Sequence, residues 1–366
     1  MKIAFLNIYS GINRRGAEAF AHELGNRLSR KHRIVFFQAG KKTPEQQMPV
    51  VQIKTSIAQP ASSFPRSLAP KLGKYLFLDA GSRSVLSFTK KVLRRVIEGG
   101  FDIVVPMNGF WQLLLLKLAR PIGKYHILVT GHAGPGWDER FNLYLKPNVF
   151  IATTQPALEW ARRACPWIRV ELIPYGIEKE TFSKAEPVQL KQSRPVILCP
   201  SALVSYKRVD LAIKAVARLK KASLVILGKG ELEDDLKALG RRMLGTRFLL
   251  TSVPYNKMPS YYSAADLVTL PSSPQENSPM VFLESLASGK VVVTTESPRN
   301  RWMLENAGVF CDPMDTDSYT KALKTGLRKR KENGKTRAID KALEKFRWEK
   351  VLEKYESLLE SMSNGR

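Results

Sequence analysis

The chain has 366 residues, 44% of them hydrophobic, and is long enough for two globular domains of ordinary size. Its 59 Lys and Arg exceed its 33 Asp and Glu, giving a formal net charge of +26 that favours polyanions, anionic lipid surfaces or phosphorylated substrates without choosing among them. No apolar run reaches the roughly 18 residues of a membrane span, and the N-terminus lacks signal-peptide features. The three separated cysteines indicate a reducing compartment, so we expect a cytoplasmic protein.

The first half of the chain alternates short apolar runs with helical patterns. An apolar run over residues 2–8, a glycine-containing loop and a helical pattern over 17–28 predict a βα unit. The same reasoning predicts six further strands, at residues 33–38, 50–53, 102–106, 125–130, 149–153 and 170–173. Strands that alternate with helices predict an α/β domain with a parallel sheet.

A basic helix is predicted over residues 84–100, and it can be interpreted in two ways. Its apolar side chains share one face (Val85, Phe88, Val92, Leu93, Val96) and its cations lie elsewhere (Lys90, Lys91, Arg94, Arg95). The pattern is typical of an interfacial helix on anionic lipid, and equally of an ordinary surface helix in a basic protein, which we favour.

Polar residues follow two of the predicted strands. Asn108 lies just past the strand at 102–106, and His132 just past the strand at 125–130. Because the carboxyl ends of parallel strands line the ligand crevice of open α/β sheets, we expect both side chains to face a binding site. Asp138 is a further candidate on the acceptor side.

The second half repeats this architecture after a polar segment. Residues 174–194 are predicted to be an interdomain linker, and strands are predicted at 196–200, 224–227, 247–250, 267–270 and 291–294. The last helical pattern, at 346–359, suits a helix that crosses back onto the first domain. The basic run at 328–337 has no interleaved aromatic residues, so we do not expect a nucleic-acid site there.

Two glutamates flank a predicted helix start in the second half. Ser278 is a suitable N-cap and Pro279 suits the first helical position, so the helix should begin near residue 278. A helix N-terminus offers unpaired N–H groups and a positive dipole end, which suit phosphate. Glu276, Ser278 and Glu284 should therefore form one site.

Glu276 and Glu284, with seven residues between them, resemble the E-x7-E signature of retaining GT-B glycosyltransferases of family 4. The flanking stretches ADLVTLPS and LESLASGK match that family in the same order. The resemblance implies two Rossmann-like domains facing each other across a cleft: an acceptor domain over 1–173, the linker over 174–194 and a nucleotide-sugar-binding domain over 195–345. Residues 346–366 would form the crossing helix.

The resemblance also implies roles for individual residues. Catalysis would fall to His132 and to Glu276, which would contact the donor sugar, while Glu284 would bind the ribose. Lys207 matches the family's diphosphate-binding Lys, whereas Ala202 stands where the family has Arg, and the neighbouring Arg208 is the candidate replacement. The remaining donor-binding candidates are Gly16 of the glycine loop, Val253 and Tyr255 near the base, and the N–H groups of Ser278, Met280 and Val281.

The predicted activity is transfer of a sugar from a UDP- or GDP-sugar to an acceptor, with retention of configuration. The acceptor would be a lipid-linked glycan or a polysaccharide, at the cytoplasmic face of an anionic membrane. No metal and no cofactor are expected apart from the nucleotide-sugar co-substrate, and no nucleic acid. Three alternatives remain open: a sugar-nucleotide-binding relative without transferase activity, a basic nucleic-acid-binding protein and, less favoured, a sugar-nucleotide epimerase.

Overall fold

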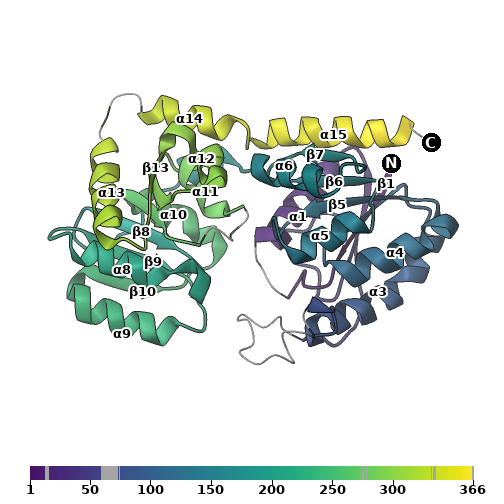
Figure 1. The fold of residues 1–366 in the computed structure, drawn as a ribbon, viewed down its shortest axis with the longest axis horizontal. Helices are drawn as coiled ribbons and strands as arrows, with labels where there is room; N and C mark the ends of the chain where they lie inside the picture. Colours follow the sequence, from purple (N-terminus) through teal and green to yellow (C-terminus); the bar gives the residue numbers. More distant parts are fainter. Residues whose placement is uncertain are drawn as a thin grey trace. The chain divides into compact units, whose positions relative to one another are not determined.

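The computed structural model describes the chain except for residues 13–15, 59–72, 74, 274, 275, 277, 331, 333, 334, 365 and 366. The chain divides into two compact units (Figure 1). The first contains Met1–Tyr175 and the chain from Val351 onward, and the second contains Gly176–Lys350.

The first unit is built on a seven-stranded parallel sheet in the order β3-β2-β1-β4-β5-β6-β7. β4 and β6 are buried along their whole length, which explains why their sequences are continuously apolar. All seven strands predicted in this half are present, within two residues of the expected bounds. They are β1 (Lys2–Asn7), β2 (Arg33–Gln38), β3 (Val50–Gln52), β4 (Ile103–Pro106), β5 (His126–Gly131), β6 (Val149–Ala152) and β7 (Val170–Leu172).

The second unit repeats the plan with a six-stranded parallel sheet in the order β10-β9-β8-β11-β12-β13. Numbered from its own first strand, it has the order of a dinucleotide-binding fold, so the predicted pair of Rossmann-like α/β domains is confirmed. Its strands are β8 (Val196–Pro200), β9 (Ser223–Leu227), β10 (Phe248–Thr251), β11 (Leu267–Leu270), β12 (Val292–Thr295) and β13 (Gly308–Cys311). Only β13 was not predicted.

Helices connect the strands of both sheets. Those of the first unit are α1 (Gly16–Leu28), α3 (Ala80–Glu98), α4 (Phe110–Gly123), α5 (Trp137–Tyr144) and α6 (Gln155–Ala164). Those that begin in the second unit are α7 (Lys179–Ser183), α8 (Val209–Ala217), α9 (Glu233–Leu244), α10 (Met258–Ala264), α11 (Met280–Ala287), α12 (Pro298–Leu304), α13 (Thr316–Lys329), α14 (Lys335–Glu344) and α15 (Trp348–Asn364). Short 3₁₀ helices lie at η1 (Ser205–Lys207), η2 (Gly245–Arg247), η3 (Tyr255–Lys257) and η4 (Glu305–Ala307).

The basic helix α3 packs beside α4 (Figure 1). Its apolar side chains Val85, Phe88, Val92 and Val96 are all buried in the core of the first unit. This face is therefore not available to lipid: the interfacial interpretation of the helix is wrong, and the surface-helix interpretation is confirmed. None of the helices that the structure describes is long and apolar enough to cross a bilayer.

The last helix, α15, begins in the second unit and continues into the first. At its start the buried Trp348 ring lies so close to Gly176 that a Cβ there would meet it at 2.4 Å. Further along, Glu356 accepts a hydrogen bond from His32 at 2.8 Å, and the Lys354 ammonium donates to the Leu172 carbonyl at 3.3 Å. The residues from Val351 onward are thus fixed to the first unit by polar contacts.

Candidate functional site

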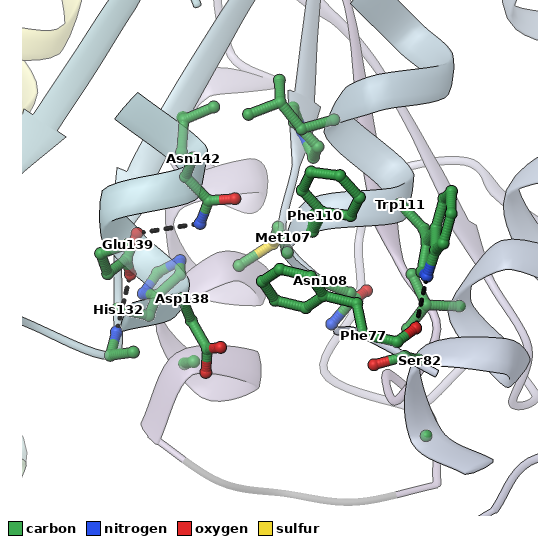
Figure 2. A pocket seen from close by; sticks show the side chains of 18 of the residues that line it. Phe77, Ser82, Met107, Asn108, Phe110, Trp111, His132, Asp138, Glu139 and Asn142 are labelled. Atoms are coloured by element: carbon green, nitrogen blue, oxygen red, sulfur yellow. Dashed lines mark hydrogen bonds between the residues drawn. The ribbon is translucent and has the colours of Figure 1, made fainter. Parts of the chain in front are cut away.

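A pocket of about 410 Å³ lies at the carboxyl ends of the strands of the first unit. Asn108 follows β4, His132 follows β5 and Asp138 lies in α5, and all three predicted residues line the pocket (Figure 2). Asn108 is fixed to the sheet, because its Oδ1 accepts a hydrogen bond from the Ile8 N–H at 2.7 Å. The fold thus brings together side chains that are 30 residues apart in the sequence.

His132 is held by an aromatic environment. Its Nδ1 lies 2.6 Å from the Tyr175 hydroxyl, and its ring makes a T-shaped pair with Phe20, with the ring centroids 6.4 Å apart. Burial lowers the pKa of His132 to about 4, because the charged imidazolium loses its hydration. His132 is therefore neutral at pH 7 and can exchange hydrogen bonds without carrying charge.

Two pocket residues that the sequence analysis missed, Glu139 and Asn142, lie one turn apart on α5. Glu139 accepts hydrogen bonds from the Ala133 N–H at 2.9 Å and from the Asn142 amide at 3.0 Å (Figure 2). Burial raises the pKa of Glu139 to about 7, since the carboxylate loses water. The i, i+3 spacing of Glu139 and Asn142 predicts that they share one helix face. The sequence analysis instead chose Asp138, in the same stretch, as the candidate on the acceptor side.

The opposite wall of the pocket is aromatic. The Phe77 and Phe110 rings are stacked with their centroids 4.5 Å apart, and the Trp111 indole donates a hydrogen bond to the Phe77 carbonyl at 2.6 Å (Figure 2). The pocket therefore has one polar and one apolar side, which is typical of sites for small organic ligands.

The second unit contains a buried ion pair between two of the predicted donor-binding residues. Lys207 ends η1 in the loop after β8, and its ammonium pairs with the carboxylate of Glu276 in the loop after β11. Each side chain is only 11% exposed. Because β8 and β11 are neighbours in the sheet, their carboxyl-end loops meet at the edge where the fold places ligands.

Arg208 lies beside this pair in a strained conformation. Its φ of 51° is left-handed, which non-glycine residues adopt mainly where the surrounding structure enforces it. Its guanidinium donates to the Ser272 carbonyl at 3.0 Å, which attaches the loop after β8 to the loop after β11. The role of Arg208 as a second cation beside Lys207 stays a prediction.

The helix between the two glutamates begins later than predicted. α11 starts at Met280, and its N-cap is Pro279, whose ψ of 114° keeps the chain extended up to that residue. Ser278 therefore lies outside the helix and does not cap it, so that prediction is wrong. Met280 and Val281 form the first turn, whose N–H groups have no intrahelical acceptor four residues earlier.

Glu284 lies within α11 and is 4% exposed. Its Oε2 accepts a hydrogen bond of 2.5 Å from the Tyr262 hydroxyl. Burial raises the pKa of Glu284, while hydrogen bonds from Tyr262 and Tyr255 lower it. The structure thus brings together Glu284 and Tyr255, two of the predicted donor-binding residues; Val253 is half-buried in the same loop after β10.

Comparisons with known proteins concern the second unit and the overall fold. Residues 181–343 match the family model described as "Glycosyl transferases group 1". This match covers most of the second unit, which we call the group 1 domain. Over its length, the chain resembles the Anabaena protein HepE in complex with UDP-glucose, with a TM-score of 0.75, 18% identity and coverage of 99% of this chain and 100% of that one. Together with the sheet topology, this likeness shows the GT-B fold.

Curated relatives match parts of the chain. One is a GDP-mannose-dependent monoacylated alpha-(1-6)-phosphatidylinositol monomannoside mannosyltransferase of Corynebacterium glutamicum, 27% identical over 42% of this chain and 45% of the relative. Another is a lipopolysaccharide 1,2-N-acetylglucosaminetransferase of Salmonella typhimurium, 25% identical over 54% of this chain and 58% of the relative. The matches thus span about half the length of these relatives.

The group 1 domain contains a further buried cation that the sequence analysis missed. Arg299, near the start of α12, is 8% exposed and donates from Nε to the Asn300 side chain at 2.8 Å. Burial lowers its pKa to about 10, and the nearby Glu276 opposes that change. In a chain with 59 Lys and Arg, no sequence signal distinguishes this arginine from the others.

The other sequence predictions concern the glycine loop and metals. Gly16 is the exposed first residue of α1; the pocket of the first unit is lined by Ala17 and Glu18 but not by Gly16. Arg15, beside it, lies outside the described residues. Within the part of the chain that the structure describes, no cluster of three or more His, Cys, Asp or Glu could hold a metal ion.

Proposed function

We propose that the chain is a retaining glycosyltransferase that transfers a sugar from a UDP- or GDP-sugar to a sugar-containing acceptor. The observation that carries the proposal is the buried pair of Lys207 and Glu276 in the group 1 domain, with Arg299 near the same carboxylate and Arg208 bonded to the loop after β11. Cations at a largely buried site attract an anionic ligand such as a diphosphate more strongly than exposed cations do.

The proposed roles follow from the charge that develops in the reaction. When the nucleoside diphosphate leaves, negative charge accumulates on its phosphate oxygens, and pre-placed cations and N–H groups stabilise it. Lys207, Arg208 and the N–H groups of Met280 and Val281 would serve this purpose. Glu276 would orient the donor sugar.

The remaining roles concern the nucleoside and the acceptor. Glu284 would bind the ribose hydroxyls, and Val253 and Tyr255 would contact the base. His132, neutral at pH 7, would bind the acceptor or the reacting end of the donor. Glu284 could accept from ribose hydroxyls and keep its hydrogen bond from Tyr262, because a carboxylate has about four acceptor sites.

The acceptor is proposed to be lipid-linked. Two matched relatives carry names that specify a phosphatidylinositol mannoside or a lipopolysaccharide, and the net charge of +26 favours an anionic membrane surface. We therefore propose peripheral binding at the cytoplasmic membrane face. High salt should release the protein from membranes, whereas retention in high salt, or full solubility in low salt, would contradict this location.

No metal or resident cofactor is proposed, with the nucleotide-sugar as the only co-substrate. Transfer should continue in the presence of EDTA, because the cations of the group 1 domain take the place of a metal at the diphosphate. Loss of transfer on chelation, with recovery on adding Mg²⁺ or Mn²⁺, would overturn this part of the proposal.

The test of the function is donor binding followed by transfer. Calorimetry with UDP-glucose, GDP-mannose and ADP-glucose should show one preferred donor, whose binding Glu284→Ala weakens and the exposed control Glu186→Ala does not. NMR of the product's anomeric proton then reports retention. Absence of binding to any nucleotide-sugar would remove the proposal, and donor binding without transfer to any glycan or glycolipid would leave only a binding protein.

A further inference from the structure

Helix α4 is apolar on its outer side as well as on its buried side. Leu113 and Leu116 are buried in the core of the first unit. On the opposite side, Leu118 is 67% exposed and Ile122 is 72% exposed, the highest values among the large hydrophobic side chains that the structure describes. Surface helices normally present polar side chains to water. Two neighbouring aliphatic side chains at such exposure therefore indicate a surface that binds a partner.

Two half-buried leucines extend this apolar side. Leu114, Leu118 and Ile122 are spaced at i, i+4 and i+8, and Leu115 lies three residues before Leu118, so all four share one side of the helix. We call these four side chains the α4 outer face. It runs along about two helical turns.

Four cations lie beside the α4 outer face. Lys117 and Arg120 belong to α4, Lys124 is its C-cap, and α4 contains no Asp or Glu. The Lys117 ammonium donates to the Lys146 carbonyl at 2.8 Å, which brings the fourth cation alongside. In the described part of the chain, none of the four pairs with a carboxylate. Burial lowers the pKa of Lys117, and the charges of Arg120 and Lys146 lower it further, so these cations repel one another.

The surroundings of α4 have the same charge. The neighbouring helix α3 contains one carboxylate, Glu98, against five exposed cations: Arg83, Lys90, Lys91, Arg94 and Arg95 (Figure 1). Beside Lys146 lies Trp167, which is 66% exposed and has its ring centroid 5.7 Å from the Lys146 ammonium. Tryptophan is enriched where proteins meet the membrane–water interface.

The charge around the α4 outer face distinguishes between two kinds of partner. A second copy of the chain, docked by the same face about a two-fold axis, would bring the same cations close together. An anionic bilayer has the complementary charge. Aliphatic side chains enter the boundary between headgroups and acyl chains, while long Lys and Arg side chains beside them reach the lipid phosphates.

We propose that α4 is the membrane-docking helix of this chain, with Leu118 and Ile122 inserted into an anionic bilayer and its flanking cations at the lipid phosphates. The inference rests on the membrane location included in the proposed function and names the surface responsible for it. The outer cations of α3 would add attraction at a distance, whereas insertion would be due to α4.

The test is binding of the full-length protein to lipid vesicles, measured by flotation. One set of vesicles is phosphatidylcholine alone, and the other is phosphatidylcholine mixed with phosphatidylglycerol. We expect the anionic vesicles to bind at least tenfold more tightly, and high salt to weaken that binding. Nucleotide-sugar binding would be measured on the same samples without vesicles.

Paired variants identify the surface. Leu118→Gln/Ile122→Gln keeps the charge and should weaken binding to anionic vesicles about tenfold, because two aliphatic side chains no longer leave water. The matched control is Met243→Gln/Met314→Gln, at exposed positions of the second unit, which should bind as wild type does.

A second pair of variants tests the charges. Arg120→Gln/Lys124→Gln should also weaken vesicle binding about tenfold. Lys220→Gln/Lys221→Gln removes the same net charge from exposed positions of the second unit and should change binding at most twofold. All four variants should keep wild-type nucleotide-sugar binding.

Each outcome bears on one proposal or the other. The docking surface is overturned if anionic vesicles bind no better than neutral ones, if Leu118→Gln/Ile122→Gln binds as wild type does, or if the two charge variants lose binding equally. Vesicle binding that depends on α4, without any nucleotide-sugar binding, would keep the docking surface and remove the proposed transferase. Sugar transfer by a protein that binds no vesicles would keep the transferase and remove the docking surface.

Discussion

Lys207 and Glu276 form an ion pair across 69 residues of sequence, with each side chain only 11% exposed. The pair joins the loops that follow the neighbouring strands β8 and β11 of the group 1 domain. Lys207 is proposed to bind the diphosphate of the donor and Glu276 its sugar. The ion pair therefore fixes the positions of both groups relative to each other before the donor binds.

Replacing one residue of this ion pair should lower the free energy of unfolding more than replacing both. Lys207→Met removes the cation that pairs with the buried Glu276 carboxylate, and we expect it to lower the free energy of unfolding by about 3 kcal/mol. The double variant Lys207→Met/Glu276→Leu should lose less than the sum of the two single variants. Urea unfolding measures all four proteins, and additive losses would show that the pair is not coupled.

Arg299 should contribute to donor affinity more than to folding. Arg299→Gln removes one of three cations from the proposed diphosphate site, and we expect the Kd of the preferred nucleotide-sugar to rise by roughly tenfold to a hundredfold, as for a lost charge-assisted contact. The control is Arg301→Gln, two residues away on α12, whose side chain is 63% exposed and paired with Glu296. Equal calorimetric affinities for the two variants would rule out a role for Arg299.

Variants of Glu284 and Tyr262 should differ in whether they lower donor affinity or the stability of the fold. Glu284→Gln can still accept from the Tyr262 hydroxyl, so its stability should change little while donor affinity falls. Tyr262→Phe removes the donor to a buried carboxylate and should destabilise the fold by about 1–3 kcal/mol. Thermal unfolding with and without nucleotide-sugar measures both effects; a Glu284→Gln protein with unchanged donor affinity would contradict the ribose role.

His132 and Glu139 should affect the pH dependence of stability in opposite directions. The folded pKa of His132 is lowered from 6.5 to about 4, so its contribution is present above pH 6.5 and is lost as the pH falls toward 4. The folded pKa of Glu139 is raised from 4.5 to about 7, so its contribution is present below pH 4.5 and is lost as the pH rises through 7. Between pH 7 and 5 each changes the free energy of unfolding by about 2 kcal/mol, with opposite sign.

Single variants should reveal these opposing effects. Relative to wild type, His132→Gln should gain stability as the pH is lowered from 7 to 5, and Glu139→Gln should lose it. The double variant should recover the wild-type slope, because the two contributions cancel. Urea unfolding at pH 5, 6 and 7 checks all four proteins, and identical slopes for the single variants would refute the assigned pKa shifts.

The strands were accessible from the sequence because parallel strands are buried on both faces and must be continuously apolar, as β4 and β6 are. Helix starts were less accessible. Ser278 and Pro279 have the residue types of a cap and a first helical position, yet the chain remains extended through Pro279 and enters α11 at Met280. Residue preference is local, whereas the start of a helix also depends on how the preceding loop is anchored.

By itself, the sequence determined the α/β architecture, the placement of Asn108 and His132 at strand ends, and the two glutamates of the group 1 domain, since apolar periodicity and motif spacing are local properties. Only the tertiary structure decided that the apolar face of α3 is buried, that Glu139 rather than Asp138 is the buried acid, and that Arg299 lies near Glu276. The reason is physical: burial, partner and pKa depend on which distant segments surround a side chain, and those neighbours exist only in the folded chain.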